Sequence, residues 1–354
     1  MIATSSLKIT KVGKSAVSEL DFDNLSFGKA FTDHMYVAEY EDGQWQNFRI
    51  EPFKNFQVHP ANIAWHYGQA VFEGMKATMH QDGTPLLFRP EMHSERINRS
   101  AERLAMPAFP KEKFMEAVYE MVKLEQKWIP KSEGSALYLR PYMVAMDEFI
   151  GVQISKTYKF VIFCCPVGPY YAKPLKLKAD DKYIRAAVGG VGEAKAAGNY
   201  AASLLPTKLA KEEGYDQIMW LDSKEFKYIQ EVGTMNIFFV FGKKVVTPST
   251  DGAILKGITR ASLVHILKSK GYDVEERPVS ITEVMSAAKS GELTEIFGSG
   301  TAAVVSFVNG IGYKGDKAEF NLDEYKIAPM LKDVINGMRS GRIPDENNWI
   351  IKVI

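Results

Sequence analysis

The stretch "EVGTMNIFFVFGKKVVTPSTDGAILKGITR", residues 231–260, carries the strongest indication of the fold of this 354-residue chain. Glu231 lies at the end of the apolar strand "YIQEV", and Gly233 and Asn236 follow it. The apolar runs on either side of "GKK" predict a β-hairpin. Gly257, Ile258 and Thr259 then begin a predicted helix, where free backbone N–H groups and the helix dipole favour a phosphate. A strand-end surface acid and a plain helix start are the simpler alternatives.

A second stretch, "GGVGEAKAAGNYAASLLP" at residues 189–206, surrounds a single lysine, Lys195, with small side chains. A dinucleotide-binding fingerprint would need Gly or Ala where Lys195 stands, which disfavours a Rossmann-type dehydrogenase. A lysine that forms a Schiff base lies beside a bulky planar cofactor, and the neighbouring glycines would let the backbone approach one. A solvated lysine on a flexible loop is the alternative.

The composition is that of a soluble globular protein, with 46% apolar and 25% charged residues and a formal net charge of +1. This balance does not indicate binding to nucleic acid or to an anionic membrane. No segment approaches the roughly 18 apolar residues of a membrane span, and the first residues lack the apolar run of a signal peptide. Cys164 and Cys165 are adjacent, and the six histidines show no metal spacing. We therefore expect buried thiols, no metal and a cytoplasmic location.

The chain length predicts two domains, and mixed strands and helices in both halves indicate an α/β (mixed α+β) fold class. In the first half, helices are predicted after Pro90 and after Pro110. The predicted division is a domain at 1–170, a linker at 171–182 where Pro, Gly and charge replace the apolar run, and a domain at 183–354.

In the second half we predict a strand "YIRAAV" at 183–188 and a helix near 200–213. The inward face of that helix is predicted to carry Ala201, Leu204, Leu205 and Leu209. A capping box of Ser280 and Glu283 opens a later helix. "GSGT", at 298–301, is predicted to be a turn between two strands that either binds phosphate or serves only as a hairpin.

Three stretches of the first half add candidate residues. "WHYGQAVFEGMKA", residues 65–77, combines aromatic side chains with an acid. "LYLRPY" alternates Tyr138 and Arg140 on one strand face. Arg96 lies in a predicted helix with three other arginines, and one of the four could reach inward. Taken singly, these are core aromatics, an edge charge and solvated arginines.

Together these stretches resemble the fold type IV pyridoxal-phosphate enzymes, and specifically the branched-chain amino acid aminotransferases. The most specific match is the order and spacing of "EVGTMNIF", "VVT" and "LKGITR" within residues 231–260. "FGKAFTDHM", "HYGQAVFEGMKA", "LYLRP", "CPVGPY", "GGVGEAKAAGNY" and "FGSGTAAVV" extend it from about Phe27 to the C-terminus. The resemblance implies a homodimer whose subunits have a smaller N-terminal domain and a larger C-terminal cofactor-binding domain.

The resemblance also implies the cofactor site. Lys195 would bind pyridoxal 5′-phosphate covalently and move a proton between the substrate Cα and the cofactor. Glu231 would pair with the pyridine nitrogen and Tyr200 with the phenolate oxygen. The residues expected to bind or adjoin the phosphate are Arg96, Gly257, Ile258, Thr259 and Thr301.

For the substrate, the family arrangement assigns the α-carboxylate to Tyr138 and to the backbone at the "GTA" turn. Arg140 would bind the distal carboxylate of 2-oxoglutarate, and part of the apolar wall would come from the partner subunit. The substrate residues implied are Phe27, Tyr67, Phe72, Tyr138, Arg140, Val152, Tyr170, Thr234 and Ala302.

The activity implied is exchange of the amino group between L-leucine, L-isoleucine or L-valine and 2-oxoglutarate in a ping-pong cycle. A D-amino acid aminotransferase and an aminodeoxychorismate lyase of the same fold are the alternatives. A non-catalytic binding protein would have no need of Lys195, Tyr200 and Glu231 together. Mammalian members carry a Cys-x-x-Cys pair after the "GTA" turn, where this chain has Ala303 and Ser306, so a thiol switch there is excluded.

Overall fold

The computed structural model describes residues 7–168, 173–250 and 252–354. The chain divides into two compact units. The first unit comprises Met1–Tyr170, Ala194–Ala197 and Gly337–Ile354, and the second comprises Tyr171–Glu193 and Gly198–Asn336. Two short segments that we had expected in the second domain thus belong to the first unit.

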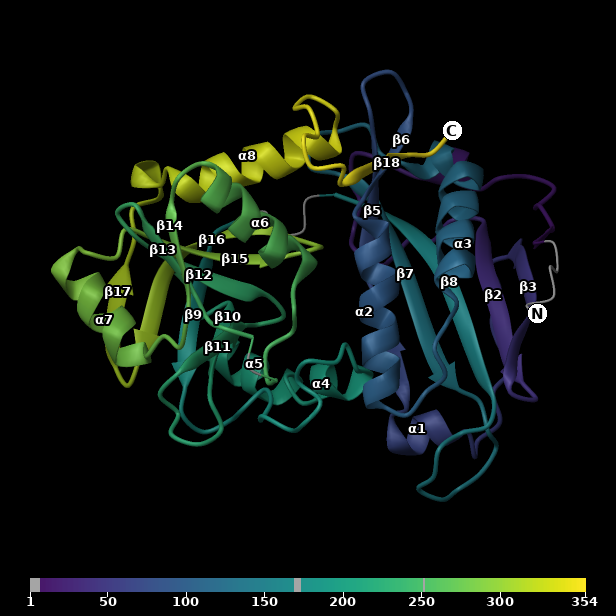
Figure 1. Cartoon of the computed structure of the whole chain (residues 1–354), viewed down its shortest axis with the longest axis horizontal. Coiled ribbons are helices and arrows are strands. Elements are labelled where there is room, and N and C mark those ends of the chain that lie inside the picture. Colours follow the sequence, from purple (N-terminus) through teal and green to yellow (C-terminus); the bar gives the residue numbers. More distant parts are fainter. Residues whose placement is uncertain (1–6, 169–172, 251) are drawn as a thin grey trace. The chain divides into compact units, whose positions relative to one another are not determined.

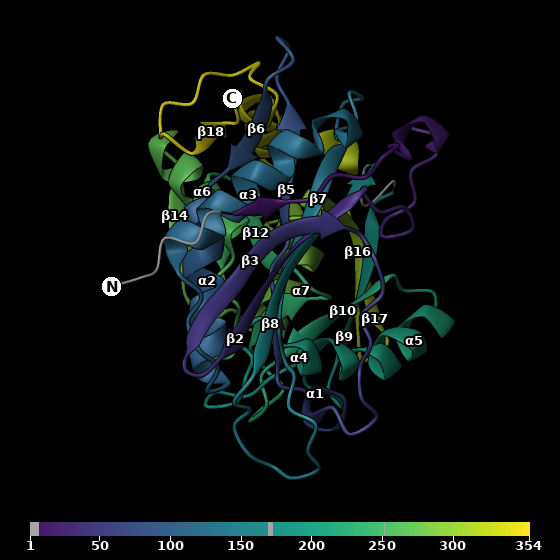
Figure 2. The ribbon, with the colours of Figure 1, turned by 90° about the vertical axis from the view of Figure 1, so that its right-hand side faces the viewer.

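The first unit is built on a sheet of nine strands among its described residues. Its strands are β1 (Lys8–Ile9), β2 (His34–Glu41), β3 (Gln44–Pro52), β4 (Ala70–Phe72), β5 (Met75–Met79), β6 (Pro85–Phe88), β7 (Ala136–Ala145), β8 (Tyr158–Val167) and β18 (Ile350–Lys352). Its helices are α1 (Ile63–Tyr67), α2 (Pro90–Arg103) and α3 (Lys111–Leu124), with 3-10 turns at Val17–Glu19 and Gln126–Trp128. The strand order is β1-β3-β2-β8-β7-β5-β6-β18, and β4 pairs with β7. Figure 2 shows the long central strands running side by side.

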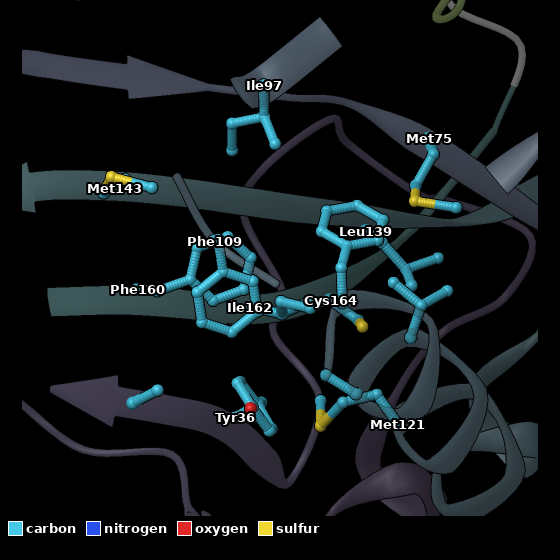
Figure 3. Packing of buried hydrophobic residues seen from close by; sticks show 14 of the residues in the cluster. Tyr36, Met75, Ile97, Phe109, Met121, Leu139, Met143, Phe160, Ile162 and Cys164 are labelled. Carbon is cyan, nitrogen blue, oxygen red and sulfur yellow. The ribbon is translucent and has the colours of Figure 1, made fainter. Parts of the chain in front are cut away.

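One face of this sheet is covered by α2 and α3 (Figure 1). The helices begin where predicted: Pro90 stands at the first position of α2, and Pro110 is the N-cap residue of α3. Alternate strand residues such as Met75 and Leu139 meet Ile97 and Met121 of the helices in a buried core (Figure 3). Burial of each large apolar side chain contributes about 1.5–3 kcal/mol to the free energy of unfolding. The packing on this face therefore holds α2 and α3 against the sheet.

The second unit also contains a sheet of nine described strands, ordered β11-β10-β9-β16-β15-β12-β13-β14 with β17 beside β16. Its strands are β9 (Leu175–Asp180), β10 (Gln217–Leu221), β11 (Ile229–Val232), β12 (Asn236–Phe241), β13 (Lys244–Thr247), β14 (Asp273–Glu276), β15 (Glu295–Gly300), β16 (Val304–Tyr313) and β17 (Asp316–Glu319). Its helices are most of α4 (Ala197–Ala201), α5 (Leu204–Glu212), α6 (Ile258–Ser269), α7 (Ile281–Ser290) and most of α8 (Ile327–Arg339), with a 3-10 turn at Leu322–Glu324.

Two local predictions in this unit are confirmed. The strands β12 and β13 form the antiparallel hairpin expected around "GKK". The Ser280 side chain accepts a hydrogen bond from the Glu283 N–H at the start of α7, as the capping box requires.

Three predictions about strands, a linker and a turn in this unit are wrong. Within residues 173–182 the expected linker contains β9, whose alternating Leu175, Leu177 and Ala179 are buried between parallel neighbours. Residues 183–188 form no strand, because the Arg185 side chain turns inward to bind backbone oxygens of neighbouring loops. "GSG" belongs to β15, and the turn follows at 301–303.

The expected helix at 200–213 is broken into α4 and α5. In a continuous helix the ring of Pro206 would collide with the carbonyl of Ala202, so the chain starts a new helix with the proline in its first turn. The break changes the inward face, which carries Pro206 and Ala210, while Leu204 is 70% exposed and Leu205 is 53% exposed.

Among the described residues, no helix has the length and apolar character needed to span a bilayer.

Candidate active site

Lys195 lies in the first unit, on a short extended segment beside β4. Its backbone N–H donates to the Ser100 hydroxyl at 2.9 Å, and its carbonyl accepts the Phe72 N–H at 3.1 Å. Ala196 next to it forms an antiparallel bridge with Val71. The side chain is half-buried, with Nζ 4.6 Å from the centroid of the Phe72 ring. The backbone contacts fix the position from which the lysine side chain extends.

A chain of contacts joins Phe72 to three other predicted substrate residues. The Arg140 guanidinium lies 4.8 Å from the centre of the Phe72 ring and donates to the Tyr138 hydroxyl at 3.4 Å. Tyr138 meets Phe27 edge-on, with ring centres 5.1 Å apart. In the first unit the structure therefore brings together Lys195 and four of the expected substrate residues.

Arg96 is buried beside the Glu73 carboxylate. Its Nε and Nη2 atoms donate to Glu73 at 2.6 and 2.9 Å, and His93 Nδ1 lies 2.7 Å from the same carboxylate. Glu73 is fully buried, which acts to raise its pKa, but the Arg96 and His93 charges outweigh burial and hold the pKa well below its usual range. Burial lowers the pKa of His93. The assignment of Arg96 to the cofactor phosphate stays a prediction.

In the second unit, the Glu231 carboxylate is buried and held on two sides. Its Oε1 accepts the Leu255 N–H at 2.7 Å, and its Oε2 lies 3.2 Å from Arg185 Nε. The same Arg185 guanidinium donates to the carbonyl oxygens of Gly192 and Ala253. The guanidinium thus links the carboxylate to the glycine-rich loop and favours its ionised form.

The start of α6 has the backbone that an anion site needs. Gly257 is the N-cap residue, and no side chain of the described residues caps the first turn. A Cβ at Gly257 would lie 2.0 Å from Asn236 Oδ1, so no other residue fits there without displacement. At the turn 301–303, Thr301 and Ala302 are half-buried, and the φ of +64° at Val304 is rare for a β-branched residue.

The carboxylate and the helix start each suit one part of pyridoxal phosphate. A buried carboxylate beside a guanidinium suits a protonated pyridine nitrogen, and uncapped N–H groups at a helix start suit a phosphate. The backbone at Gly192 is also packed closely, since an added Cβ would lie 2.4 Å from both Ala186 Cβ and the Ala253 oxygen. Tyr200, on α4, is half-buried.

Four predicted substrate residues have no described contact with Lys195, Arg140 or Glu231. Tyr67 is 42% exposed on α1, Val152 is 87% exposed on the loop after β7, and Thr234 is exposed at the β11–β12 turn. Tyr170 lies outside the described residues.

The sequence reasoning missed two polar residues that hold the predicted ones: Ser100 at the Lys195 amide and Arg185 beside Glu231. Glu73, the acid of the 65–77 stretch, was a candidate with no assigned partner, and the structure pairs it with Arg96. Of the two missed residues, only Ser100 left a signal in the sequence, because it recurs at helical spacing with Arg96, Ile97 and Ala101 on the buried face of α2.

A separate polar cluster lies near β2 in the first unit. Asp33, His34 and Glu125 bring three potential ligand atoms within 4.8 Å of one another. These groups are already bonded: His34 Nε2 accepts the Val12 N–H, Nδ1 lies 2.5 Å from Glu125, and Asp33 accepts the Trp128 indole N–H. The cluster fixes the segment before β2 to the sheet.

A comparison with protein-family models matches the class IV aminotransferases over residues 70–311. Branched-chain-amino-acid transaminase 1 of Bacillus subtilis is 44% identical over 339 residues, which cover 94% of this chain and 95% of the relative. A probable branched-chain-amino-acid aminotransferase of Staphylococcus epidermidis is 47% identical, with 94% of each chain covered.

Solved structures agree on the fold. The branched-chain amino acid aminotransferase of Escherichia coli superposes with a TM-score of 0.73 at 24% identity, covering 91% of this chain and 99% of that one. The branched-chain amino acid aminotransferase of Thermobaculum terrenum, in its PLP form, superposes with a TM-score of 0.72 at 24% identity, covering 90% of this chain and 98% of that one. The chain belongs to the class IV aminotransferases and, within them, to the branched-chain amino acid aminotransferases.

Proposed function

We propose that the protein is a pyridoxal-phosphate-dependent transaminase that exchanges the amino group between L-leucine, L-isoleucine or L-valine and 2-oxoglutarate. The observation that carries this proposal is the 44% identity, over 94% of the chain, with a branched-chain-amino-acid transaminase. The stretch around Lys195 and the stretch from Glu231 to Arg260 supply the residue types that the reaction needs.

The cofactor supplies an electron sink that stabilises negative charge at the substrate Cα. Lys195 is the base that takes the proton from Cα and returns it to the product side. Its backbone bonds to Ser100 and Phe72 support this role, because a proton-transfer group must be held at a fixed position. Glu231 holds a proton at the pyridine nitrogen, and Arg185 supports it by keeping the carboxylate charged and oriented.

Anionic groups are bound by separate parts of the chain. The N–H groups of Ile258 and Thr259 donate to the cofactor phosphate at the start of α6, together with Thr301 and Arg96. Tyr200 orients the phenolate oxygen of the ring. The backbone at Thr301 and Ala302 binds the substrate α-carboxylate with Tyr138.

The substrate side chain meets an apolar surface that also tolerates a carboxylate. Phe27 and Phe72 supply the apolar part, and Arg140 supplies the charge for the distal carboxylate of 2-oxoglutarate. Arg140 is only partly buried, and its stacking on Phe72 lets one surface serve both substrates. Tyr67, Tyr170 and Thr234 complete the substrate residues.

The working form is a homodimer in the cytoplasm. The side chains of Val152 and Leu204 are 87% and 70% exposed, which supports their burial against a second copy of the chain. In this arrangement Val152 contributes to the wall of the partner's substrate pocket.

The test is the absorption spectrum of the purified protein, followed on adding L-leucine, L-glutamate or D-alanine without any oxo acid. L-leucine and L-glutamate should convert the cofactor band to that of the pyridoxamine form, and D-alanine should not. Conversion by D-alanine alone would replace the substrate assignment with that of a D-amino acid aminotransferase. A protein that forms no cofactor band with added pyridoxal phosphate would remove the proposal.

A further inference from the structure

The face of the first sheet opposite its hydrophobic core carries two buried cations. Lys76, on β5, is 7% exposed, and Arg339, at the end of α8, is 6% exposed. Both belong to the first unit. Neither residue has a part in the proposed transamination.

The strand register places Lys76 in a row across this face. Lys76 pairs with Tyr138 of β7, so the two side chains share one face. Ala77 pairs with Leu87 and Thr78 with Leu86, and the same register brings Lys76 opposite Phe88. The core residues Met75 and Ala77 point to the other side.

Arg339 lies over the same row. Its guanidinium carbon is 4.5 Å from the centre of the Phe88 ring, and its carbonyl accepts a hydrogen bond from the Thr78 hydroxyl. Burial and the Arg339 charge together lower the pKa of Lys76 to about 7. Burial lowers the pKa of Arg339 to about 10. The two cations are therefore close enough to repel each other.

The Arg339 guanidinium is short of partners. Its Nε and Nη1 atoms are buried and have no hydrogen-bond partner among the described residues. Within this part of the chain, no carboxylate lies at ion-pair distance from it. By contrast, the buried Arg96 has the Glu73 carboxylate at 2.6 Å.

The cost of burying the Arg339 charge can be compared with the stabilisation that its contact with Phe88 provides. Burying an unpaired charge costs several kcal/mol even after relaxation of the protein, whereas stacking on an aromatic ring returns about 0.5–2 kcal/mol. The contact with Phe88 therefore does not offset the burial of Arg339. An anion bound at this place would compensate the Arg339 charge, and the neighbouring Lys76 would add to the attraction.

We propose that Arg339 and Lys76 bind a small oxyanion, a carboxylate or an inorganic phosphate, at a site on β5 and β6. Its residues are not among those assigned to the cofactor and the amino acid, although Lys76 is the cross-strand neighbour of Tyr138. The Nε and Nη1 atoms of the guanidinium donate to the oxyanion, and the Lys76 ammonium supplies the second charge. Phe88 forms the apolar floor under the guanidinium.

The test is isothermal titration of the protein loaded with pyridoxal phosphate, using inorganic phosphate and acetate in separate experiments at constant ionic strength. Loading ensures that added phosphate does not report on the cofactor phosphate site. Arg339→Gln should weaken the affinity at least about tenfold, the effect of losing one charge-assisted hydrogen bond. The matched control Arg103→Gln, which removes an exposed arginine of α2, should leave the affinity unchanged.

Phosphate binding without acetate binding identifies a phosphate site, and the reverse identifies a carboxylate site; both support the proposal. Equal affinities in the native protein and in Arg339→Gln, or no binding of either anion to the native protein, overturn it. Thermal unfolding of the native protein and of Arg339→Gln, both in an anion-poor buffer, shows whether the variant is correctly folded. There Arg339→Gln should be at least as stable as the native protein, and a large loss of stability would instead make Arg339 a structural residue.

Discussion

Replacing Glu73 by glutamine tests the most tightly held charge group in the first unit. Glu73 is fully buried and accepts hydrogen bonds from Arg96 at 2.6 and 2.9 Å, while His93 lies 2.7 Å away. Glutamine keeps the side-chain volume but removes the charge. Its NH2 group is itself a donor and cannot accept the hydrogen bonds that Arg96 and His93 make to the carboxylate. The substitution leaves the Arg96 guanidinium buried without a counter-charge.

Removing one partner of a buried ion pair destabilises a protein by about 3–5 kcal/mol. For a cooperative unit of roughly 190 residues, each kcal/mol lowers Tm by about 2–4 °C. Glu73→Gln should therefore lower the Tm of the first unit by between about 6 and 20 °C. Differential scanning calorimetry of the native protein and the variant is the appropriate measurement.

Glu116→Gln is the matched control. Glu116 pairs with Lys113 one helical turn away at 2.8 Å, and its side chain is 38% exposed. An exposed pair of this kind contributes no more than about 1 kcal/mol, so the control should move Tm only slightly. If Glu73→Gln cost no more than this control, the account of Glu73 as the counter-charge of Arg96 would be refuted.

The pH dependence gives a second check on Glu73. Because its pKa is lowered in the folded protein, the stabilisation it gives is complete above the unfolded value of about 4.5 and is lost as the pH falls. The difference in stability between the native protein and Glu73→Gln should therefore be largest above about pH 5 and should shrink on acidification. A difference that stays constant down to about pH 3 would contradict the assigned direction.

Three further outcomes are expected. Lys195→Ala should fold, as judged by circular dichroism, but should not transaminate L-leucine; unimpaired turnover would remove the central role of this lysine. Gly257→Ala should bind pyridoxal phosphate more weakly in an absorbance titration, because its Cβ would lie 2.0 Å from Asn236 Oδ1, and an unchanged affinity would contradict the assignment of this helix start. Cys164 and Cys165 are 0% and 3% exposed and burial raises the pKa of both thiols, so the native protein should react with a thiol reagent far more slowly than the unfolded chain.

The elements that the sequence predicted well depend on local signals. Helix α2 begins at Pro90 and α3 directly after Pro110, and their apolar residues recur at helical spacing against one sheet face. The hairpin of β12 and β13 and the capping box at α7 are also decided by a few adjacent residues. Such features need no knowledge of distant parts of the chain.

The wrong predictions arose where residue composition or helical periodicity was given more weight than a competing local signal. Residues 175–180, "LKLKAD", alternate apolar and polar side chains as a strand does, yet their lysines suggested a linker. The helix expected at 200–213 had good periodicity, but the clash that Pro206 creates four residues earlier outweighed it. Both signals were present in the sequence.

The partners of buried charges could not be predicted in the same way, because they are distant in the sequence. Glu73 and Arg96 are 23 residues apart, and Arg185 and Glu231 are 46 residues apart. Four arginines of residues 89–103 carry the same charge, and only the helix face and the strand beneath it select the one that meets Glu73. A sequence shows which charges exist but not which of them will be neutralised.

The two buried arginines of the first unit illustrate why this matters for function. Arg96 and Arg339 are similarly enclosed, at 5% and 6% exposure, so the cost of burying each charge is comparable. Glu73 supplies a counter-charge to Arg96 at 2.6 Å, whereas the described residues offer no carboxylate to Arg339. Since a folded protein does not retain an uncompensated charge without a reason, the difference between the two arginines is best explained by a counter-charge that Arg339 takes from solution.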